Sequence, residues 1–251
     1  MASDYDCTLE GLPGPPAVRL GLRMVDRLKK ESAERIVAAR AEQPFDDADD
    51  LARRASLEGQ EMSLLAAANA LTSLSGHRRQ QVWDASALKS APPLLRAAPI
   101  VEDMVELAAA PEGEEIVWDC AALGLTLRRH PLALLRASLA RRGLATAAEL
   151  RDLPDGCKVK YCGIVTLRQQ PQTAHGTVFV SLEDETGTVQ VICWKSIREK
   201  QRQFLLESRQ LVVFGRWQCE GDVRNLVAER LGELTPLLGR LGKSAWSRDF
   251  R

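Results

Sequence analysis

The sequence lacks the patterns that announce particular kinds of chemistry. Its 251 residues contain no Gly-rich phosphate loop, no His-Glu-x-x-His motif and no Ser/His/Asp order typical of hydrolases. Six cysteines occur without a Cys-x-x-Cys pair, and only three histidines exist to complete a zinc site with them. We therefore expect no catalytic residue, metal site or cofactor here, and interpret each cysteine as a small buried hydrophobic residue.

A long apolar run and a signal peptide are also missing, so we expect a cytoplasmic chain with reduced thiols and no membrane contact. The formal net charge is zero, with 34 Lys plus Arg against 34 Asp plus Glu. Overall composition therefore predicts neither a nucleic-acid-binding protein nor a membrane-surface protein.

Charge and aromatic residues are unevenly distributed along the chain. From residue 157 onward there are 15 Lys plus Arg against 10 Asp plus Glu, and eight of the aromatic side chains fall in this stretch. The earlier part carries the compensating negative charge. The joint shift indicates a domain boundary near residue 157, and a chain of this length accommodates two domains.

The first part of the chain has helical periodicity after a Pro- and Gly-rich start, residues 1–16, which is typical of a connector. Within residues 17–91, one apolar stripe is formed by Leu22, Val25 and Leu28, and Ser32 is placed to cap a following helix. A short helix is predicted from about Asp47 to Ala55. Two helix-hairpin-helix units in tandem explain this pattern most simply.

Residues 92–119 hold one Arg against seven acids and several prolines, which predicts an exposed acidic linker with a short helix around Val101 to Ala109. Residues 120–156 then form a helical connector with a helix from Pro131 to Arg142. Its arginines are candidates for phosphate contact, although a solvated helix face is the favoured interpretation.

Residues 157–237 switch to a period of two, which predicts strands. In the hairpin "VFVSLEDETGTVQVICW", a turn at Asp184 to Gly187 pairs Leu182 with Val189 inside and Phe179 with Ile192 outside. Its acidic residues are interpreted as a solvated turn, not a metal site. One strand, a hairpin, a helix around Ile197 to Leu205 and a second hairpin give the order of the OB-fold. The predicted class is therefore α+β, with an all-α tandem helix-hairpin-helix region before a five-stranded OB-fold barrel.

OB-folds bind oligonucleotides on the face of their second and third strands. Here Phe179 and Trp194 are predicted to stack on bases, while Lys160, Arg168 and Arg216 meet phosphates of single-stranded DNA or RNA. An alternative from a different class is a protein-interaction module, because an exposed apolar face also fits a partner protein.

Several segments resemble the C-terminal region of the error-prone alpha-type subunit of bacterial C-family DNA polymerases. They are "DCTLEGLPGPPAVRLGLRMV", "LAAANALTSLSGHRRQQVW", "RRHPLALLR", "GIVTLRQQPQTAHGTVFVSLEDETGTVQVICW" and "SRDFR". The resemblance implies a fragment from behind a polymerase that copies damaged DNA, with the catalytic aspartates, magnesium and nucleotide sites in missing upstream domains. The strands also resemble the anticodon-binding domain of class II aminoacyl-tRNA synthetases, a third and remote alternative.

Two departures from the polymerase pattern bear on partners. The first predicted hairpin carries Arg27, Lys29 and Lys30 where glycines are expected, so Lys29 and Lys30 would contact DNA as point charges. No Gln begins a sliding-clamp peptide between the domains, so direct clamp binding is not expected. The tail, residues 238–251, offers Trp246 and Phe250 as candidates for docking another damage-response protein, unless it folds back on the barrel.

Overall fold

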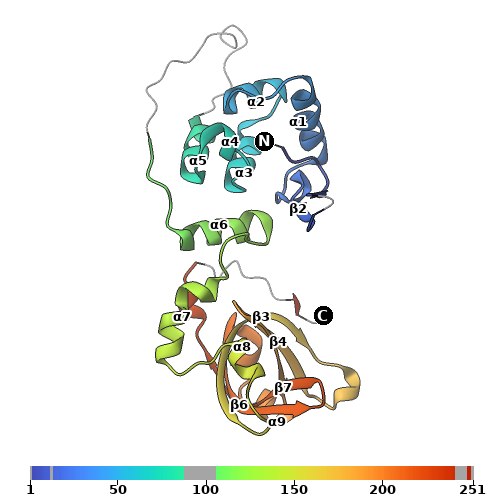
Figure 1. The fold of residues 1–251 in the computed structure, drawn as a ribbon, viewed down its shortest axis with the longest axis vertical. Helices are drawn as coiled ribbons and strands as arrows, with labels where there is room; N and C mark the ends of the chain where they lie inside the picture. The colour runs from blue at the N-terminus through green and yellow to red at the C-terminus, as the bar shows by residue number, and fades with distance from the viewer. Residues whose placement is uncertain (1, 12–13, 88–105, 241–247, 250–251) are drawn as a thin grey trace. The chain divides into compact units, whose positions relative to one another are not determined.

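The computed structural model describes residues 2–11, 14–87, 106–240 and 248–249. These fall into two compact units, Met1–Thr126 and Leu127–Arg251, each with its own buried core. Figure 1 shows the helices of the first unit and the strands of the second. No helix within the described ranges is long and apolar enough to cross a membrane.

The first unit begins with a short β-ladder where the sequence predicted a connector and a helix. Strands β1 (Thr8–Glu10) and β2 (Ala17–Arg19) pair antiparallel, and only the single 3-10 turn η1 (Leu22–Met24) follows. The expected stripe still faces inward, since Leu22 and Val25 are buried. The stripe identified buried positions correctly, but three apolar residues over two turns cannot distinguish a helix from a turn.

The rest of this unit consists of short helices, as predicted for residues 17–91. They are α1 (Lys30–Glu42), α2 (Ala48–Arg54), α3 (Gly59–Ala67), α4 (Thr72–Ser75) and α5 (Arg78–Ala87). The Asp47 carboxylate caps α2 by accepting from the Asp50 N–H at 2.7 Å. Ser32 is not the cap of α1, because Lys29 occupies that position and Ser32 lies buried against Glu61 of α3.

Residues 92–119 are not an exposed linker throughout, because a further helix, α6 (Glu112–Leu123), packs against the helical unit. Arg78 of α5 is buried and donates to the Glu115 carbonyl at 2.9 Å and to the Asp119 carboxylate. The expected helix at Val101 to Ala109 lies partly outside the described residues, and residues 106–109 are not helical. Two of the acids that suggested a solvated linker, Glu115 and Asp119, instead pair with a buried arginine.

The second unit contains a closed barrel with the predicted OB-fold order. Its strands are β3 (Lys158–Gln169), β4 (Val178–Asp184), β5 (Gly187–Cys193), β6 (Gln210–Glu220) and β7 (Val223–Glu233). They are arranged β4-β5-β7-β6-β3, and β3 also pairs with β4 to close the cylinder. Two short helices, α9 (Lys195–Lys200) and α10 (Arg202–Glu207), connect the third and fourth strands, where the sequence predicted one helix.

The hairpin register agrees with the sequence prediction. Leu182 pairs with Val189, and Phe179 with Ile192. Gly221 supplies the positive φ, +57°, in the turn that joins β6 to β7. In the helical connection, Leu205 is buried, whereas Phe204 is 38% exposed.

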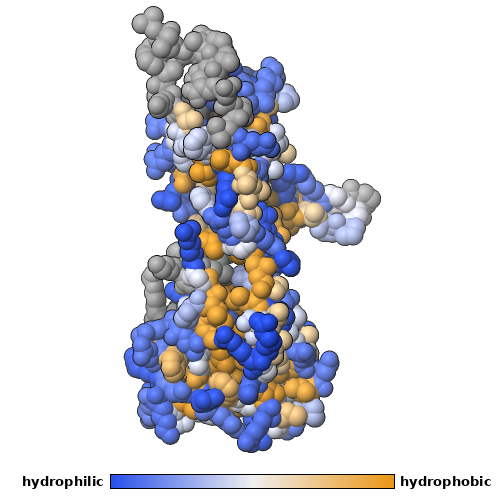
Figure 2. Space-filling model, turned by 90° about the vertical axis from the view of Figure 1, so that its left-hand side faces the viewer, coloured by the Kyte–Doolittle hydropathy of each residue, from blue (hydrophilic) through white to orange (hydrophobic). Residues whose placement is uncertain are grey.

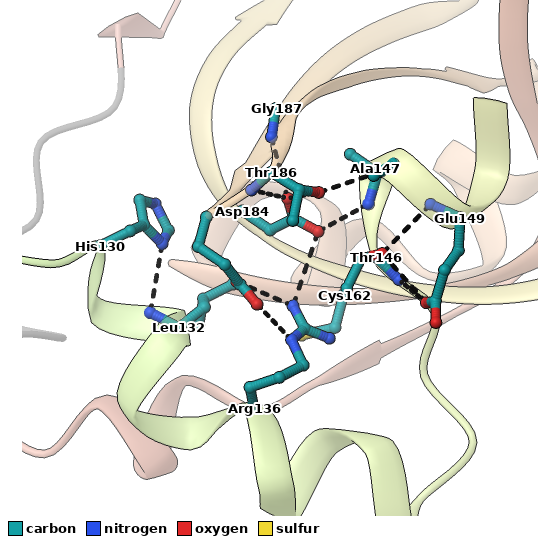
Figure 3. A network of polar contacts seen from close by, with 12 residues as sticks. His130, Leu132, Arg136, Thr146, Ala147, Glu149, Cys162, Asp184, Thr186 and Gly187 are labelled. Atoms are coloured by element: carbon teal, nitrogen blue, oxygen red, sulfur yellow. Dashed lines mark hydrogen bonds and ion pairs between the residues drawn. The ribbon is translucent and has the colours of Figure 1, made fainter.

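Residues before the predicted boundary at 157 pack onto the barrel. Helices α7 (Pro131–Arg141) and α8 (Ala147–Arg151) surround the turn between β4 and β5. The Asp184 carboxylate is buried and accepts from the N–H groups of Ala147 at 2.8 Å and Thr186 at 2.7 Å, as Figure 3 shows. The sequence predicted that the turn acids are solvated, which is wrong for Asp184, because its buried carboxylate accepts from the first N–H group of α8.

Arg136 of α7 fastens this helix to the same turn. Its guanidinium hydrogen-bonds Glu185 through two nitrogens, with Nη2 at 2.9 Å from Oε2, and lies 3.6 Å from the Asp184 carboxylate. Burial raises the pKa of Glu185, but the hydrogen bonds and the positive charge of Arg136, together with a backbone hydrogen bond, bring the pKa below its ordinary value. At least one of the connector arginines therefore holds the fold together and is not a free phosphate ligand.

Candidate nucleic-acid interface

An open hollow of about 580 Å³ lies on the outside of the barrel where β4 begins and β5 ends. Phe179 and Trp194 contribute aromatic rings to its lining, and His175, Thr177 and Lys195 contribute polar groups. Trp194 is 52% exposed and Phe179 is half-buried. The hollow thus presents flat apolar surface beside a cation, which is the combination that single-stranded nucleic acids require.

The local sequence explains both aromatic positions. Alternation along β4 turns Val180 and Leu182 into the core and Phe179 outward. Trp194 directly follows β5 and is the first residue before α9, so its carbonyl accepts from the N–H groups of Ile197 and Arg198 at 2.9 and 3.0 Å. The backbone of Trp194 is therefore fixed while its ring stays in solvent.

A loop of positive-φ residues forms one side of the hollow. His175 has a φ of 47° and Gly176 a φ of 89°. A Cβ placed on Gly176 would lie 3.4 Å from Cγ of Lys195, so the aliphatic part of Lys195 supports the loop. Lys195 is not among the binding residues predicted from the sequence, although its position next to Trp194 was a usable signal. Its ammonium lies 3.8 Å from Glu199 in an exposed pair, and such pairs are weak.

Arg168 is not at this surface, contrary to the sequence prediction. Its side chain is 1% exposed and donates to the Leu205 carbonyl at 2.6 Å and to the Ser208 carbonyl. A β-bulge between Val165 and Leu167 shifts the register of β3 against β4 and places Arg168 opposite the inward-facing Val180. The extra residue in the bulge turns the following side chains of β3 to the opposite face of the strand. Arg168 therefore points inward and binds carbonyls at the end of α10, and it is not available to bind a phosphate.

Lys160 and Arg216 are exposed, as predicted, but they do not adjoin the aromatic pair. Lys160 lies opposite Phe214 of β6, whereas Phe179 lies opposite Gln169, nine residues further along β3. That separation amounts to roughly 30 Å of strand. The predicted single face is therefore two surfaces, one aromatic and one cationic.

Lys29 and Lys30 lie at the start of α1 in the helical unit and are exposed. Arg27, in the preceding turn, has a φ of 61°, the left-handed conformation that glycine adopts most easily. The hairpin therefore makes the turn without the glycine that the sequence lacks. Lys30 is not entirely free, because its ammonium lies 3.6 Å from Glu34 and 5.5 Å from the centre of the Tyr5 ring.

The candidate docking residues Trp246 and Phe250 lie outside the described residues. The short strand β8 (Arg248–Asp249) pairs in parallel with Leu167 and Arg168 of β3. This pairing is what a tail folded back on its barrel would make, the alternative to a docking peptide.

Two cysteines, Cys162 and Cys193, fit the expectation of buried hydrophobic residues. Burial raises the pKa of the Cys162 thiol to about 11 and that of Cys193 to about 12, so both are neutral thiols at physiological pH. Cys7 departs from the expectation, because it is exposed and accepts from the Gly21 N–H at 3.3 Å.

Comparison with known families supports the two architectural assignments. The helix-hairpin-helix motif family matches residues 1–81, and the OB-fold nucleic acid binding domain family matches residues 159–234. The second match covers the barrel and both of its outward surfaces. Two families of nucleic-acid-associated domains therefore meet in one chain.

Curated bacterial proteins match across both units. The error-prone DNA polymerase of Ralstonia nicotianae is 50% identical over 99% of this chain and 24% of its own length. That of Ralstonia pickettii is 52% identical over 94% of this chain and 22% of its own, and that of Aromatoleum aromaticum 50% identical over 100% and 24%. The chain thus spans about a quarter of the length of these relatives.

Among solved structures, an asparaginyl-tRNA synthetase aligns with part of this chain. Asparaginyl-tRNA synthetase from Pyrococcus horikoshii is 21% identical over 36% of this chain and 22% of its own, with a TM-score of 0.31. The family assignment therefore comes from the sequence relatives: this chain is homologous to the C-terminal part of larger bacterial proteins named error-prone DNA polymerase.

Proposed function

We propose that this chain is the DNA-binding region of an error-prone polymerase, and that it holds single-stranded template DNA in the hollow at Phe179 and Trp194 during synthesis across damaged bases. One observation carries the proposal: an exposed tryptophan with a fixed backbone stands beside a second aromatic ring on the outer face of an OB-fold domain. Each base stacked on such a ring contributes about 1–3 kcal/mol.

The charge around the hollow suits the same ligand. Lys195 and Arg198 both approach the loop at Gly176, and Lys195 is committed only to an exposed pair that water and salt weaken. Phosphate groups can therefore compete for it. Such contacts predict binding that weakens as salt rises and that depends little on base sequence.

The helical unit would add a second binding site for the same template. Lys29 and Lys30 stand at the first turn of α1, where backbone N–H groups lack helical partners and the helix dipole favours an anion. We assign them to a phosphate of the duplex or of the primer-template junction.

The polymerase reaction itself is assigned to parts of the relatives that this chain does not match. Of the described residues, no group of three carboxylate, histidine or cysteine side chains is arranged to hold a metal ion. We propose template binding and recruitment as the contribution of this chain.

Fluorescence anisotropy with a labelled thymine oligonucleotide of about 16 nucleotides tests the proposal. Phe179→Ala and Trp194→Ala should each weaken binding by at least about fivefold. Phe204→Ala is the matched control, because Phe204 is an exposed aromatic residue of the same unit outside the hollow. Equal affinities in all three variants would remove the stacking role.

A second function is favoured by a different observation. In the second unit, Leu127 and Leu134 are 80% and 39% exposed. Figure 2 shows apolar side chains among the hydrophilic ones on the lower part of the face it presents, where the barrel lies. Such a surface fits the docking of a damage-response protein. If the intact chain at micromolar concentration and low salt binds no oligonucleotide, this interaction role replaces DNA binding.

A further inference from the structure

A second outward surface crosses β3, β6 and β7, strands that are hydrogen-bonded neighbours in the barrel. We call it the cationic strip and define it as Lys158, Lys160, Phe214, Arg216 and Arg230. Lys160 lies opposite Phe214, which lies opposite Arg230 on the next strand. Two residues away along β3 and β6, at the next outward-facing position, Lys158 lies opposite Arg216. The four cations therefore form two adjacent rows on one face.

The aromatic ring of Phe214 in the strip is in contact with the cations and is not open for stacking on a base. The guanidinium carbon of Arg230 lies 3.9 Å from the centre of the Phe214 ring, and the Lys160 ammonium lies 6.0 Å from it. A guanidinium stacked on a ring keeps its N–H groups in the plane, where they can hydrogen-bond an oxyanion. This geometry differs from the hollow, where Trp194 is open to stacking.

The positive charge of the strip is hardly compensated. Among the residues that the structure describes, no ion pair involves Lys158, Lys160 or Arg230. Arg216 lies 3.8 Å from Glu229, and both side chains are half-exposed. It also donates to the Gly156 carbonyl at 3.0 Å.

A β-bulge produces this arrangement. The register of β6 against β7 shifts between Phe214 and Gly215, so that Arg230 lies opposite Phe214 and Ala228 opposite Gly215. Glu229 is left without a partner in the ladder. The bulge therefore puts a cation, and not Glu229, across from the ring.

We propose that the cationic strip binds the sugar-phosphate backbone of single-stranded nucleic acid, on a stretch of strand separate from the one whose bases enter the hollow. An extended polyanion suits it better than a compact anion, because Lys160 and Arg230 are two strand spacings apart, roughly 10 Å. Nucleic acid is favoured over an acidic peptide because the matched nucleic-acid-binding family includes both residues. The inference rests on the proposed DNA binding but concerns other residues.

The salt dependence of binding separates the two surfaces. For single strands the slope of log affinity against log salt concentration is about −0.7 per phosphate contact. In the intact chain, the double variant Lys160→Ala with Arg230→Ala should therefore make the slope shallower by about 1.4 on a thymine oligonucleotide of about 16 nucleotides. Phe179→Ala should lower affinity and leave the slope unchanged.

Two further variants control this experiment. Lys200→Ala with Arg202→Ala removes two exposed cations outside the strip and should leave the slope nearly unchanged. Lys160→Arg with Arg230→Lys keeps both charges and should retain the original slope, which separates loss of charge from loss of fold.

Several outcomes would overturn the inference. One is an unchanged slope in the double alanine variant, and another is an equal loss in the control at Lys200 and Arg202. A third is failure of the charge-retaining variant to keep the slope. The last is a competition result. It is the outcome in which a glutamate peptide of similar length displaces the oligonucleotide from the wild-type chain but not from the double variant Lys160→Ala with Arg230→Ala. If Phe179→Ala has no effect while the strip variant changes the slope, the hollow is wrong and the strip stands.

Discussion

The helical unit and the barrel both bury apolar side chains, but they differ in how the polar groups of the backbone are satisfied. The barrel closes its ladder from β3 to β4, so neighbouring strands supply most partners. The helices are short, and each helix end leaves N–H and carbonyl groups without partners. In the helical unit, side chains from other helices supply the hydrogen-bond partners that these groups lack.

Gln81 and Arg54 illustrate this dependence on side chains. The buried Gln81 accepts from the Leu71 N–H at 3.1 Å and donates to the Gly76 carbonyl at 2.6 Å, which fixes both ends of α4. Arg54 donates to the carbonyls of Gln43, at 2.9 Å, and Ala39 at the end of α1. The helical unit should therefore be the more sensitive of the two to polar substitutions.

The largest effect is expected from Arg78→Met in the helical unit. Removing the guanidinium breaks a buried ion pair with Asp119 and a hydrogen bond to the Glu115 carbonyl, which costs about 3–5 kcal/mol. Hydrogen exchange should accelerate in α3, α5 and α6 while the barrel amides stay protected. The neighbouring Arg79→Met removes a half-exposed pair with Glu114 and an exposed hydrogen bond to the Ala108 carbonyl, and should cost less than about 1 kcal/mol. Equal effects would show that burial does not decide the outcome.

Arg168→Met tests the main exception in the barrel. Two carbonyls at the end of α10 lose a charged donor, so the free energy of unfolding should fall by about 2–4 kcal/mol. Urea unfolding followed by the fluorescence of the buried Trp217 measures it. Arg202→Met, exposed on α10, should change it by no more than about 0.5 kcal/mol. Unaltered stability together with lost DNA binding would restore Arg168 to the phosphate-binding role.

A smaller change is expected at the N-cap of α2. Asp47→Ala removes the acceptor for the Asp50 N–H and should destabilise the helical unit by about 1 kcal/mol. Thermal unfolding and exchange of the Asp50 amide report on it. Asp46→Ala, next to it and exposed, makes no such cap and serves as the control. Matching losses would mean that general charge near the helix matters more than the hydrogen bond.

The smallest effect concerns pH and His130, which caps α7 by accepting from the Leu132 N–H at 3.2 Å. Burial lowers the pKa of His130 despite the opposing pull of Glu183. The stabilisation is thus present above the unfolded pKa of about 6.5 and is lost as the pH falls through the folded value. Exchange of the α7 amides should rise in this window by the equivalent of less than about 1 kcal/mol.

His130→Ser is the matched variant, since serine can cap the helix but does not titrate. Its α7 amides should show no change across the same pH range. A wild-type chain whose α7 exchange is independent of pH would contradict the assignment.

Sequence periodicity was most informative where both faces of an element are regular. The register of the hairpin from Val178 to Cys193 followed from alternation alone, because Val180 and Leu182 have to point inward together. The positions of Phe179 and Trp194 followed from it. The five-stranded order and the helix before β6 were predictable for the same reason.

Predictions from periodicity were wrong where the structure is irregular. No residue in "GIVTLRQ" marks the bulge that turns Arg168 inward, and alternation extended through it gives the wrong face. The acids of α6 read as a solvated linker, because the arginine that they neutralise lies far away in the sequence. Lys160 and Gln169, the residue opposite Phe179, share strand β3, but only the pairing of that strand with two different neighbours shows that Lys160 and Phe179 belong to different surfaces.

The most direct measurement is photo-crosslinking of the intact chain to an oligonucleotide that carries 5-bromouracil, with the attachment sites mapped by mass spectrometry. The account predicts that bases crosslink to residues of the hollow, above all Trp194 and Phe179, and that excess unlabelled single strand abolishes the crosslinks. Crosslinks that avoid these residues while the oligonucleotide is bound would contradict it.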